Sequence, residues 1–297
     1  MTMRPPIAPV RPNATKPAEV IRRRTVLVGG LALGVGACAV PDDIIGVETR
    51  PPVTSADIAS RGHRIFICTT RRESEIPSEL YSGRRGSRLQ FASVDVVIPP
   101  THEQGKVERP KRLPPNPNEH FVIVNPSFYR TEPEFREAIN VEVRKRPRGR
   151  RNGLFWVHGY NTSMTDGVLR LAQFVEDSGY DGVPVLYSWA SQAKLTGYVY
   201  DINSALIARD RVEDLPRLMR NSEAEGLDVI AHSMGNLVVM EAIRGVGKGG
   251  LFNSSGKLRN VILASPEIDI DLFAAQLESI PRDQRRFYVL TSSDDRA

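Results

Sequence analysis

Residues 227–236 read Leu-Asp-Val-Ile-Ala-His-Ser-Met-Gly-Asn, and this stretch decides the fold. Its first five residues form a short apolar run that predicts a buried strand. Small residues, Ala231 and Gly235, stand two positions before and after Ser233, as a sharp strand-to-helix turn requires because its backbones nearly touch. Helical spacing follows at Leu237, Val238, Ala242 and Ile243. The stretch therefore predicts a nucleophile elbow that exposes the hydroxyl of Ser233 at the top of a sheet.

A second motif supports the prediction of a nucleophile elbow. This support is needed because the pattern small-x-Ser-x-Gly often arises by chance. Residues 153–157 form another short apolar strand candidate, and His-Gly-Tyr-Asn-Thr-Ser follows directly at 158–163. Serine hydrolases with such an elbow place one oxyanion donor in a tight His-Gly loop and the other at the amide after the nucleophile. The predicted oxyanion hole consists of the amides of Met234 and of Tyr160 or Asn161.

Together these motifs resemble the α/β-hydrolase fold, and more narrowly a bacterial esterase/lipase-like family of unassigned function. The resemblance covers roughly residue 61 to the C-terminus. It implies a serine hydrolase that cleaves an ester, thioester or amide through an acyl-enzyme on Ser233. The motifs that carry it are His158 to Ser163, Ser188-Trp189 and Ala231 to Gly235.

Apolar runs and helical patterns alternate along the domain, which predicts an α/β fold. The alternation favours a mostly parallel sheet with helices on both faces. Earlier strand candidates separated by turn-rich loops predict an antiparallel N-terminal edge. The expected strands are 64–69, 92–98, 121–124, 153–157, 183–187, 227–231, 261–264 and 287–290. The expected helices cover 132–143, the residues after the Ser163 capping box, 206–219, and a segment beginning near Leu272.

The acid of a catalytic triad has several candidates. The resemblance implies an acid after a late strand, and its Ser-x-Asp-x-Ala pattern matches Ser293, Asp295 and Ala297, so Asp295 is the first choice. Its neighbour Asp294 could substitute. Asp269 and Asp271 are less favoured, because they suit the cap of the helix beginning near Leu272.

The triad histidine should come last in the chain, after the serine and the acid. No histidine follows His232, whose side chain an elbow would point away from the serine. His158 suits a structural role in the oxyanion loop. We therefore expect the chain to be truncated before the last strand and histidine loop of the fold. Either a longer protein carries that histidine, or this is a catalytically impaired hydrolase-fold lipoprotein that binds a ligand or envelope partner.

The N-terminal 38 residues have the features of an export signal. Arg22-Arg23-Arg24 precedes an apolar stretch at 25–37, which is too short to span a bilayer but suits a signal-peptide core. The segment resembles a twin-arginine signal, and Val35-Gly36-Ala37-Cys38 resembles a lipobox whose cysteine is lipidated. The alternative is a plain secretory signal or an uncleaved anchor. Residues 39–60 are expected to be a tether, and 61–297 the hydrolase domain, lipid-anchored at the periplasmic face of the envelope.

Composition narrows the classes of partner. The formal net charge is +5, but the basic clusters lack aromatic interleaving or a nucleic-acid motif, so no nucleic-acid partner is expected. No phosphate loop, Gly-x-Gly-x-x-Gly or paired His and Cys spacing is present, so neither a cofactor nor a metal is expected. The predicted partners are a small-molecule or lipid acyl substrate and, through Cys38, the membrane.

Overall fold

The computed structural model describes residues 43–212, 218, 220–250 and 252–291. The strands among them are β1 (Gly62–Glu73), β2 (Tyr81–Val97), β3 (Val122–Tyr129), β4 (Asn152–Val157), β5 (Val183–Ser188), β6 (Gly226–His232), β7 (Leu258–Ala264) and β8 (Phe287–Leu290). The α-helices are α1 (Ser55–Arg61), α2 (Glu132–Arg144), α3 (Met164–Ser178), α4 (Tyr198–Val212), α6 (Gly235–Lys248) and α7 (Ile270–Leu277).

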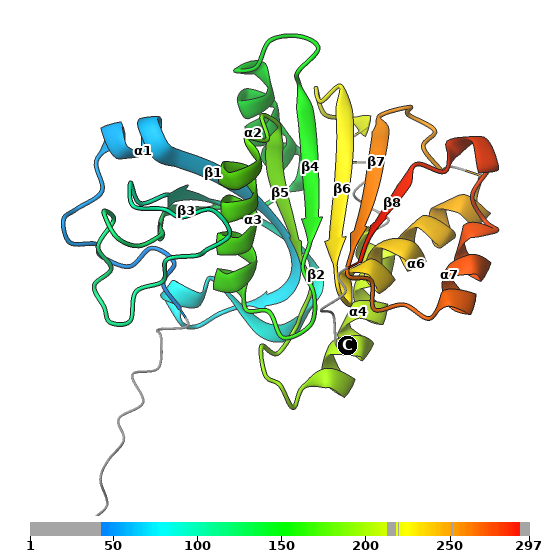
Figure 1. The fold of residues 1–297 in the computed structure, drawn as a ribbon, viewed down its shortest axis with the longest axis horizontal. Coiled ribbons are helices and arrows are strands. Elements are labelled where there is room, and N and C mark those ends of the chain that lie inside the picture. The colour runs from blue at the N-terminus through cyan, green and yellow to red at the C-terminus, as the bar shows by residue number, and fades with distance from the viewer. Residues whose placement is uncertain (1–42, 213–217, 219, 251, 292–297) are drawn as a thin grey trace, which may run out of the picture. The chain divides into compact units, whose positions relative to one another are not determined.

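These strands form one sheet in the order β3-β2-β1-β5-β4-β6-β7-β8 (Figure 1). The pairs β1/β2 and β2/β3 are antiparallel, and every other neighbouring pair is parallel. The structure therefore confirms the predicted α/β fold, with a mostly parallel sheet and an antiparallel N-terminal edge. β8 has the predicted bounds, and each other strand is longer than predicted, although β2 ends and β3 begins one residue inside the expected limits.

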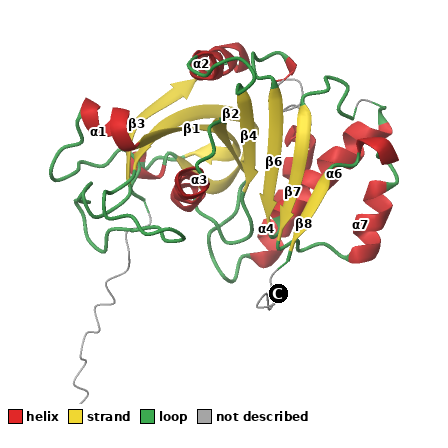
Figure 2. Cartoon of the chain, turned by 45° about the horizontal axis from the view of Figure 1, so that its top comes forward, coloured by secondary structure: helices red, strands yellow, loops and turns green. Residues whose placement is uncertain are grey.

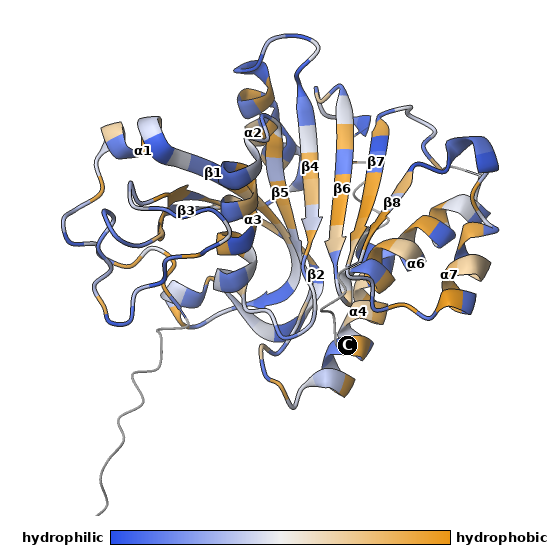
Figure 3. Ribbon diagram, viewed as in Figure 1, coloured by the Kyte–Doolittle hydropathy of each residue, from blue (hydrophilic) through white to orange (hydrophobic). Residues whose placement is uncertain are grey.

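Helices cover both faces of the sheet (Figure 2). α3 packs on one face, and α2, α4 and α6 pack on the other. Successive residues of one strand enter different cores because side chains alternate across a sheet. In β4, Leu154 packs with α3, whereas Phe155 packs on the opposite face with α2, α4 and α6. A strand that is buried on both faces carries mostly apolar residues, as the central strands do over much of their length (Figure 3).

The first turns of α4 depart from the prediction, since the helix begins at Tyr198 and the expected start was residue 206. The reason is that polar side chains occupy much of its buried face here, beside Ala205. Asp201 and Ser204 are both buried, and Asp201 accepts hydrogen bonds from the preceding loop. An apolar periodicity cannot reveal a helix whose inner face carries a carboxylate and a hydroxyl.

The expected tether over 39–60 is wrong for its described part. Ile44 and Ile45 are buried in the core on the α3 side. The amide of Gly46 donates to the carbonyl of Ile123 at 2.8 Å, which attaches the segment to β3. α1 then begins at a capping box formed by Thr54 and Asp57. These contacts show that residues 43–60 are a packed part of the fold.

The expected export signal, Cys38 and the C-terminal acid candidates Asp294 and Asp295 lie outside the described residues. Within the described ranges, no helix combines the length and apolar character that crossing a bilayer requires.

Candidate active site

Ser233 lies between β6 and α6, as predicted, and adopts a left-handed backbone conformation with φ of 49°. An L-residue other than glycine pays a steric cost there, so the surrounding structure must impose it. Two contacts to the end of β7 do so. The amide of Ser233 donates to the carbonyl of Ala264 at 3.0 Å, and the buried Asn236 amide group donates to the carbonyls of Ser233 and Ala264. The turn is therefore fixed by its neighbouring strand.

The elbow and the His-Gly loop approach each other so closely that only glycine fits between them. A Cβ atom on Gly235 would lie 2.5 Å from the carbonyl oxygen of His158 and 2.7 Å from that of Val157. A Cβ atom on Gly159 would lie 2.9 Å from the Cβ of Ser233. The predicted requirement for a small residue after the serine is confirmed, and the two motifs adjoin.

The structure separates the amides that were predicted for the oxyanion hole. The Asn161 amide already donates to the carboxylate of Asp201 at 3.2 Å, so it is engaged. Among the described residues, the amides of Tyr160 and Met234 donate to no other protein group. Of the two alternatives in the His-Gly loop, Tyr160 is therefore the one whose donor is available.

A buried arginine, Arg71, binds the backbone of the His-Gly loop. Arg71 of β1 donates through Nε to the Ser188 hydroxyl at 2.8 Å, and through Nη2 to the carbonyl of Thr162 at 2.7 Å. Its Nη1 donates to the carbonyl of Ser191 at 2.9 Å. Burial lowers the pKa of Arg71 to about 10, and nearby Asp201 opposes that shift, so the guanidinium stays charged at neutral pH. The sequence analysis missed Arg71, whose signal was an arginine two residues after the predicted strand 64–69.

Asp201 of α4 completes the support from the other side. Its carboxylate is buried and accepts from the Ser191 hydroxyl at 2.6 Å, from the Gln192 amide at 2.8 Å and from the Asn161 amide. The Ser191 hydroxyl in turn accepts from the Thr162 amide at 3.0 Å. A buried charge needs hydrogen-bond partners, and these three donors supply them, with charged Arg71 nearby. The network fixes the backbone that presents the Tyr160 amide.

His158 is buried within this network and has a structural role, in agreement with the prediction. Its Nδ1 lies 2.9 Å from the carbonyl of Gly159, which can only accept, so Nδ1 carries the proton. Nε2 then accepts from the Ser188 hydroxyl at 3.1 Å, and the ring stacks on Trp189. Burial and the charge of Arg71 lower the pKa of His158 to about 3. The imidazole is therefore neutral, and both of its nitrogens are engaged by Gly159 and Ser188.

The carboxylate that contacts the serine is Glu267, which the sequence analysis did not select. The Ser233 hydroxyl donates to Glu267 Oε2 at 3.1 Å, and the Tyr198 hydroxyl donates to Oε1 at 2.8 Å. The nearby Asp269 instead caps α7, as expected, by accepting from the amides of Asp271 and Leu272. The available signal for Glu267 was its position three residues after the strand that pairs with β6.

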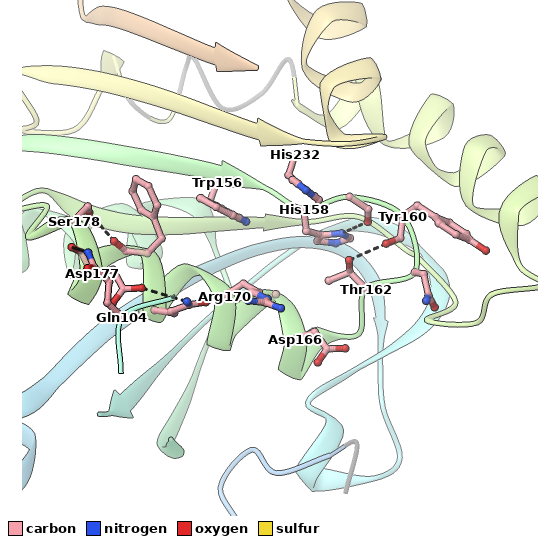
Figure 4. Close-up of a pocket in the computed structure, with 15 residues that line it drawn as sticks. Gln104, Trp156, His158, Tyr160, Thr162, Asp166, Arg170, Asp177, Ser178 and His232 are labelled. Carbon is pink, nitrogen blue, oxygen red and sulfur yellow. Dashed lines mark hydrogen bonds between the residues drawn. The ribbon is translucent and has the colours of Figure 1, made fainter. Parts of the chain in front are cut away.

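A cavity of about 750 Å³ adjoins the His-Gly loop on the α3 side of the sheet (Figure 4). Its floor includes Trp156 of β4, and His232 stands at the end near the elbow. The side chains of α3 form one wall, with Arg170 and Asp166 along it. Space for a bound molecule therefore continues from the oxyanion loop along α3.

No group of three His, Cys, Asp or Glu side chains is arranged to hold a metal ion in the part of the chain that the structure describes. His102 forms a titratable cluster with Glu108 and with Asp177, which lines the cavity. The two nitrogens of His102 lie 2.8 Å and 2.9 Å from these carboxylates, so both are already engaged.

Comparison with known families agrees with this geometry. Residues 131–297, which are more than half of the chain, match the family described as alpha/beta hydrolase of unknown function (DUF900). The chain belongs to this family. The family match runs from the start of α2 and includes the His-Gly loop, the elbow and Glu267. No curated protein matches the chain.

Proposed function

We propose that this member of the DUF900 family is a serine hydrolase that cleaves an ester, thioester or amide through an acyl-enzyme on Ser233. The observation that carries the proposal is the left-handed turn at Ser233, held at the carboxyl end of β6 beside a His-Gly loop with an available amide. Ligands of open α/β sheets bind at this edge. The backbone of Ser233 is strained, and β6, β7 and the His-Gly loop hold it in this conformation. Such strain around one hydroxyl is consistent with a nucleophile.

The chemistry follows from the groups around that hydroxyl. Attack by Ser233 Oγ on an acyl carbon places negative charge on the former carbonyl oxygen, which the amides of Met234 and Tyr160 would stabilise. Each such donor typically lowers the barrier by about 2.7 to 4 kcal/mol. Their value depends on a fixed position, because a loop that reorganises during the reaction loses this benefit. The buried contacts of Arg71 and Asp201 supply that rigidity.

Exposed apolar side chains on the two segments that meet beside Ser233 favour a substrate with an apolar acyl group. Leu195 is 81% exposed, Val199 72% and Ile270 79%. They lie on two segments that the hydrogen bond from Tyr198 to Glu267 joins beside Ser233. Exposed apolar side chains on segments that meet beside a reactive group are consistent with a ligand-binding surface. We propose a small-molecule or lipid acyl compound as the substrate class.

Labelling with a fluorophosphonate probe tests the proposed nucleophile, since the probe reacts with activated serines. We expect the full chain to be labelled and the Ser233→Ala variant to remain unlabelled. Ser127→Ala is the matched control, because it removes a hydroxyl from exposed β3 and should leave labelling unchanged. A wild-type chain that resists the probe, or equal labelling of Ser233→Ala, would reject the proposal and favour the noncatalytic ligand-binding alternative.

We further propose that the protein is exported and anchored by lipid at Cys38. The support is the sequence of residues 22–38, in which three arginines precede an apolar stretch and a lipobox-like Val-Gly-Ala-Cys. Palmitate incorporation that is lost in Cys38→Ser, together with accumulation of a precursor under globomycin, is the expected result. A wild-type product that carries no label would contradict lipid anchoring.

A further inference from the structure

The hydroxyl of Ser233 contacts a carboxylate directly, without an intervening group. Ser233 Oγ donates to Glu267 Oε2 at 3.1 Å across 34 residues of sequence. Glu267 belongs to the short connection between β7 and α7. A carboxylate at hydrogen-bond distance from a hydroxyl has the geometry that a general base requires.

The connection that carries Glu267 is pinned at both ends. The Ser265 amide donates to the carbonyl of Leu290 at 2.7 Å, which joins its start to β8. At its other end, Asp269 accepts from the first amides of α7, and the Phe273 amide donates back to the carbonyl of Asp269. The position of Glu267 is therefore a consequence of the sheet and of the helix cap.

Tyr198 fixes the orientation of the carboxylate. Its hydroxyl donates to Oε1 at 2.8 Å, which leaves Oε2 directed at the serine. The ring of Tyr198 packs edge-on against Tyr160, with centroids 5.4 Å apart. Tyr160 in turn donates through its hydroxyl to the carbonyl of Leu195. Residues of the oxyanion loop and of α4 thus hold the same carboxylate.

We propose that Glu267 is a catalytic residue that takes the proton from Ser233 Oγ, and that Tyr198 is a positioning residue that holds the carboxylate for this step. This inference rests on the proposed function. It assigns the base of the reaction to a residue that is present and in contact with the nucleophile.

The proton balance of the step is closed. When Ser233 Oγ forms a bond to the acyl carbon, its proton passes to Glu267 Oε2, and the negative charge moves from the carboxylate to the substrate oxygen. When the tetrahedral intermediate collapses, the bond to the leaving group breaks and the leaving group takes the proton from Glu267. Water then attacks the acyl-enzyme, gives its proton to Glu267, and the proton returns to Ser233 Oγ as the acid departs.

The titratable groups around Glu267 leave this assignment in place. The hydrogen bond to Glu267 raises the pKa of Tyr198, so the tyrosine stays a neutral donor. Tyr160 packs behind Tyr198, and the Asp269 carboxylate faces the amides of α7. His232 neighbours Ser233 at the end of β6, on the side of the α3 cavity. Buried His158, on the far side of the Gly159 loop, is neutral.

The first test measures the rate at which the full chain reacts with the fluorophosphonate probe. We expect Glu267→Gln, which keeps the size of the side chain, to lower this rate by at least about 100-fold, the usual contribution of a general base. Asp271→Asn is the matched control, because it removes an exposed carboxylate from the adjoining α7 and should leave the rate unchanged. Thermal melting of each variant reports its folding.

The second test is the pH dependence of the same rate in the wild-type chain, Glu267→Gln and Tyr198→Phe. A base that must be deprotonated gives the rate a limb on the acidic side, and we expect Glu267→Gln to remove that limb. We expect Tyr198→Phe to displace the limb to higher pH, because the carboxylate loses a donor that favours its charged form.

The outcomes distinguish this inference from the function on which it rests. An acidic limb that persists unchanged in Glu267→Gln, or a Glu267→Gln rate within about threefold of wild type, would overturn the role of Glu267, and labelling that still depended on Ser233 would leave the hydrolase proposal standing. A wild-type chain that does not react, or a Ser233→Ala chain that reacts equally, would overturn both.

Discussion

The substitution Gly235→Ala tests whether the elbow and the His-Gly loop form one rigid unit. The added Cβ atom would meet two backbone carbonyls at the end of β4, those of His158 at 2.5 Å and of Val157 at 2.7 Å. Real Cβ atoms essentially never come closer than 3.0 Å, so the loop must retreat by about half an ångström. Backbone atoms within a parallel sheet cannot rotate away as a flexible side chain does.

Overpacking of this kind costs about 1 to 3 kcal/mol of unfolding free energy. For a domain of this size, that cost lowers the melting temperature by about 2 to 12 °C. The same displacement moves the Tyr160 amide relative to Met234, and a misplacement of about 1 Å can cost 100-fold in rate, so we expect fluorophosphonate labelling to slow by about tenfold or more.

The matched control is Gly249→Ala at the other end of α6. Gly249 has a φ of −79°, and its Cβ atom would meet the carbonyl of Val246 at an ordinary 3.5 Å. We expect its unfolding free energy to change by less than about 1 kcal/mol, with unchanged labelling. Wild-type melting and labelling in Gly235→Ala would refute the reasoning, because they would show that the loop yields without cost.

Two further predictions concern the buried network. Arg71→Met should lower the unfolding free energy by roughly 3 to 5 kcal/mol in a urea titration, because it leaves Asp201 as a buried charge without its cationic neighbour. Arg72→Met, which changes the adjacent exposed arginine, should stay within about 0.5 kcal/mol of wild type, and equal effects of the two would contradict the role of Arg71. Because burial lowers the pKa of His158 to about 3, the unfolded state takes up the extra proton below about pH 6.5. The stability contributed by neutral His158 is therefore fully present above that pH and falls by at most about 1.4 kcal/mol per pH unit toward pH 3, a slope that His158→Gln should remove in urea titrations at each pH.

The parts of the fold that sequence predicted well depend on local rules. Ser163 and Asp166 form the expected capping box, and α3 follows it. The elbow was recognisable because its steric demands fall on residues two positions from Ser233, which are fixed by the turn itself. Asp269 caps α7 as its type and position indicated. In each case the interacting groups lie within a few residues of each other.

The missed parts depend on contacts that sequence spacing does not display. Arg71 meets Ser188 across 117 residues, and nothing in either segment marks the other as its partner. The polar inner face of α4 hid the start of that helix, since Asp201 faces a loop and not an apolar core. Ile44 and Ile45 join the core through a single bridge to β3, in a segment whose prolines suggested a tether. Only the assembled sheet brings these groups together.

The sheet order explains why an acid after β7 and an acid after β8 would play different parts. β6 and β7 are neighbours, and the Ser233 amide bonds directly to the last residue of β7. A carboxylate a few residues beyond that point, such as Glu267, reaches the serine hydroxyl itself. β8 is one strand further, and two strand spacings amount to about 9.6 Å. A carboxylate that follows β7 therefore needs no intervening imidazole to contact the serine. The labelling rate of Glu267→Gln, compared with that of wild type, reports whether β7 supplies the working acid.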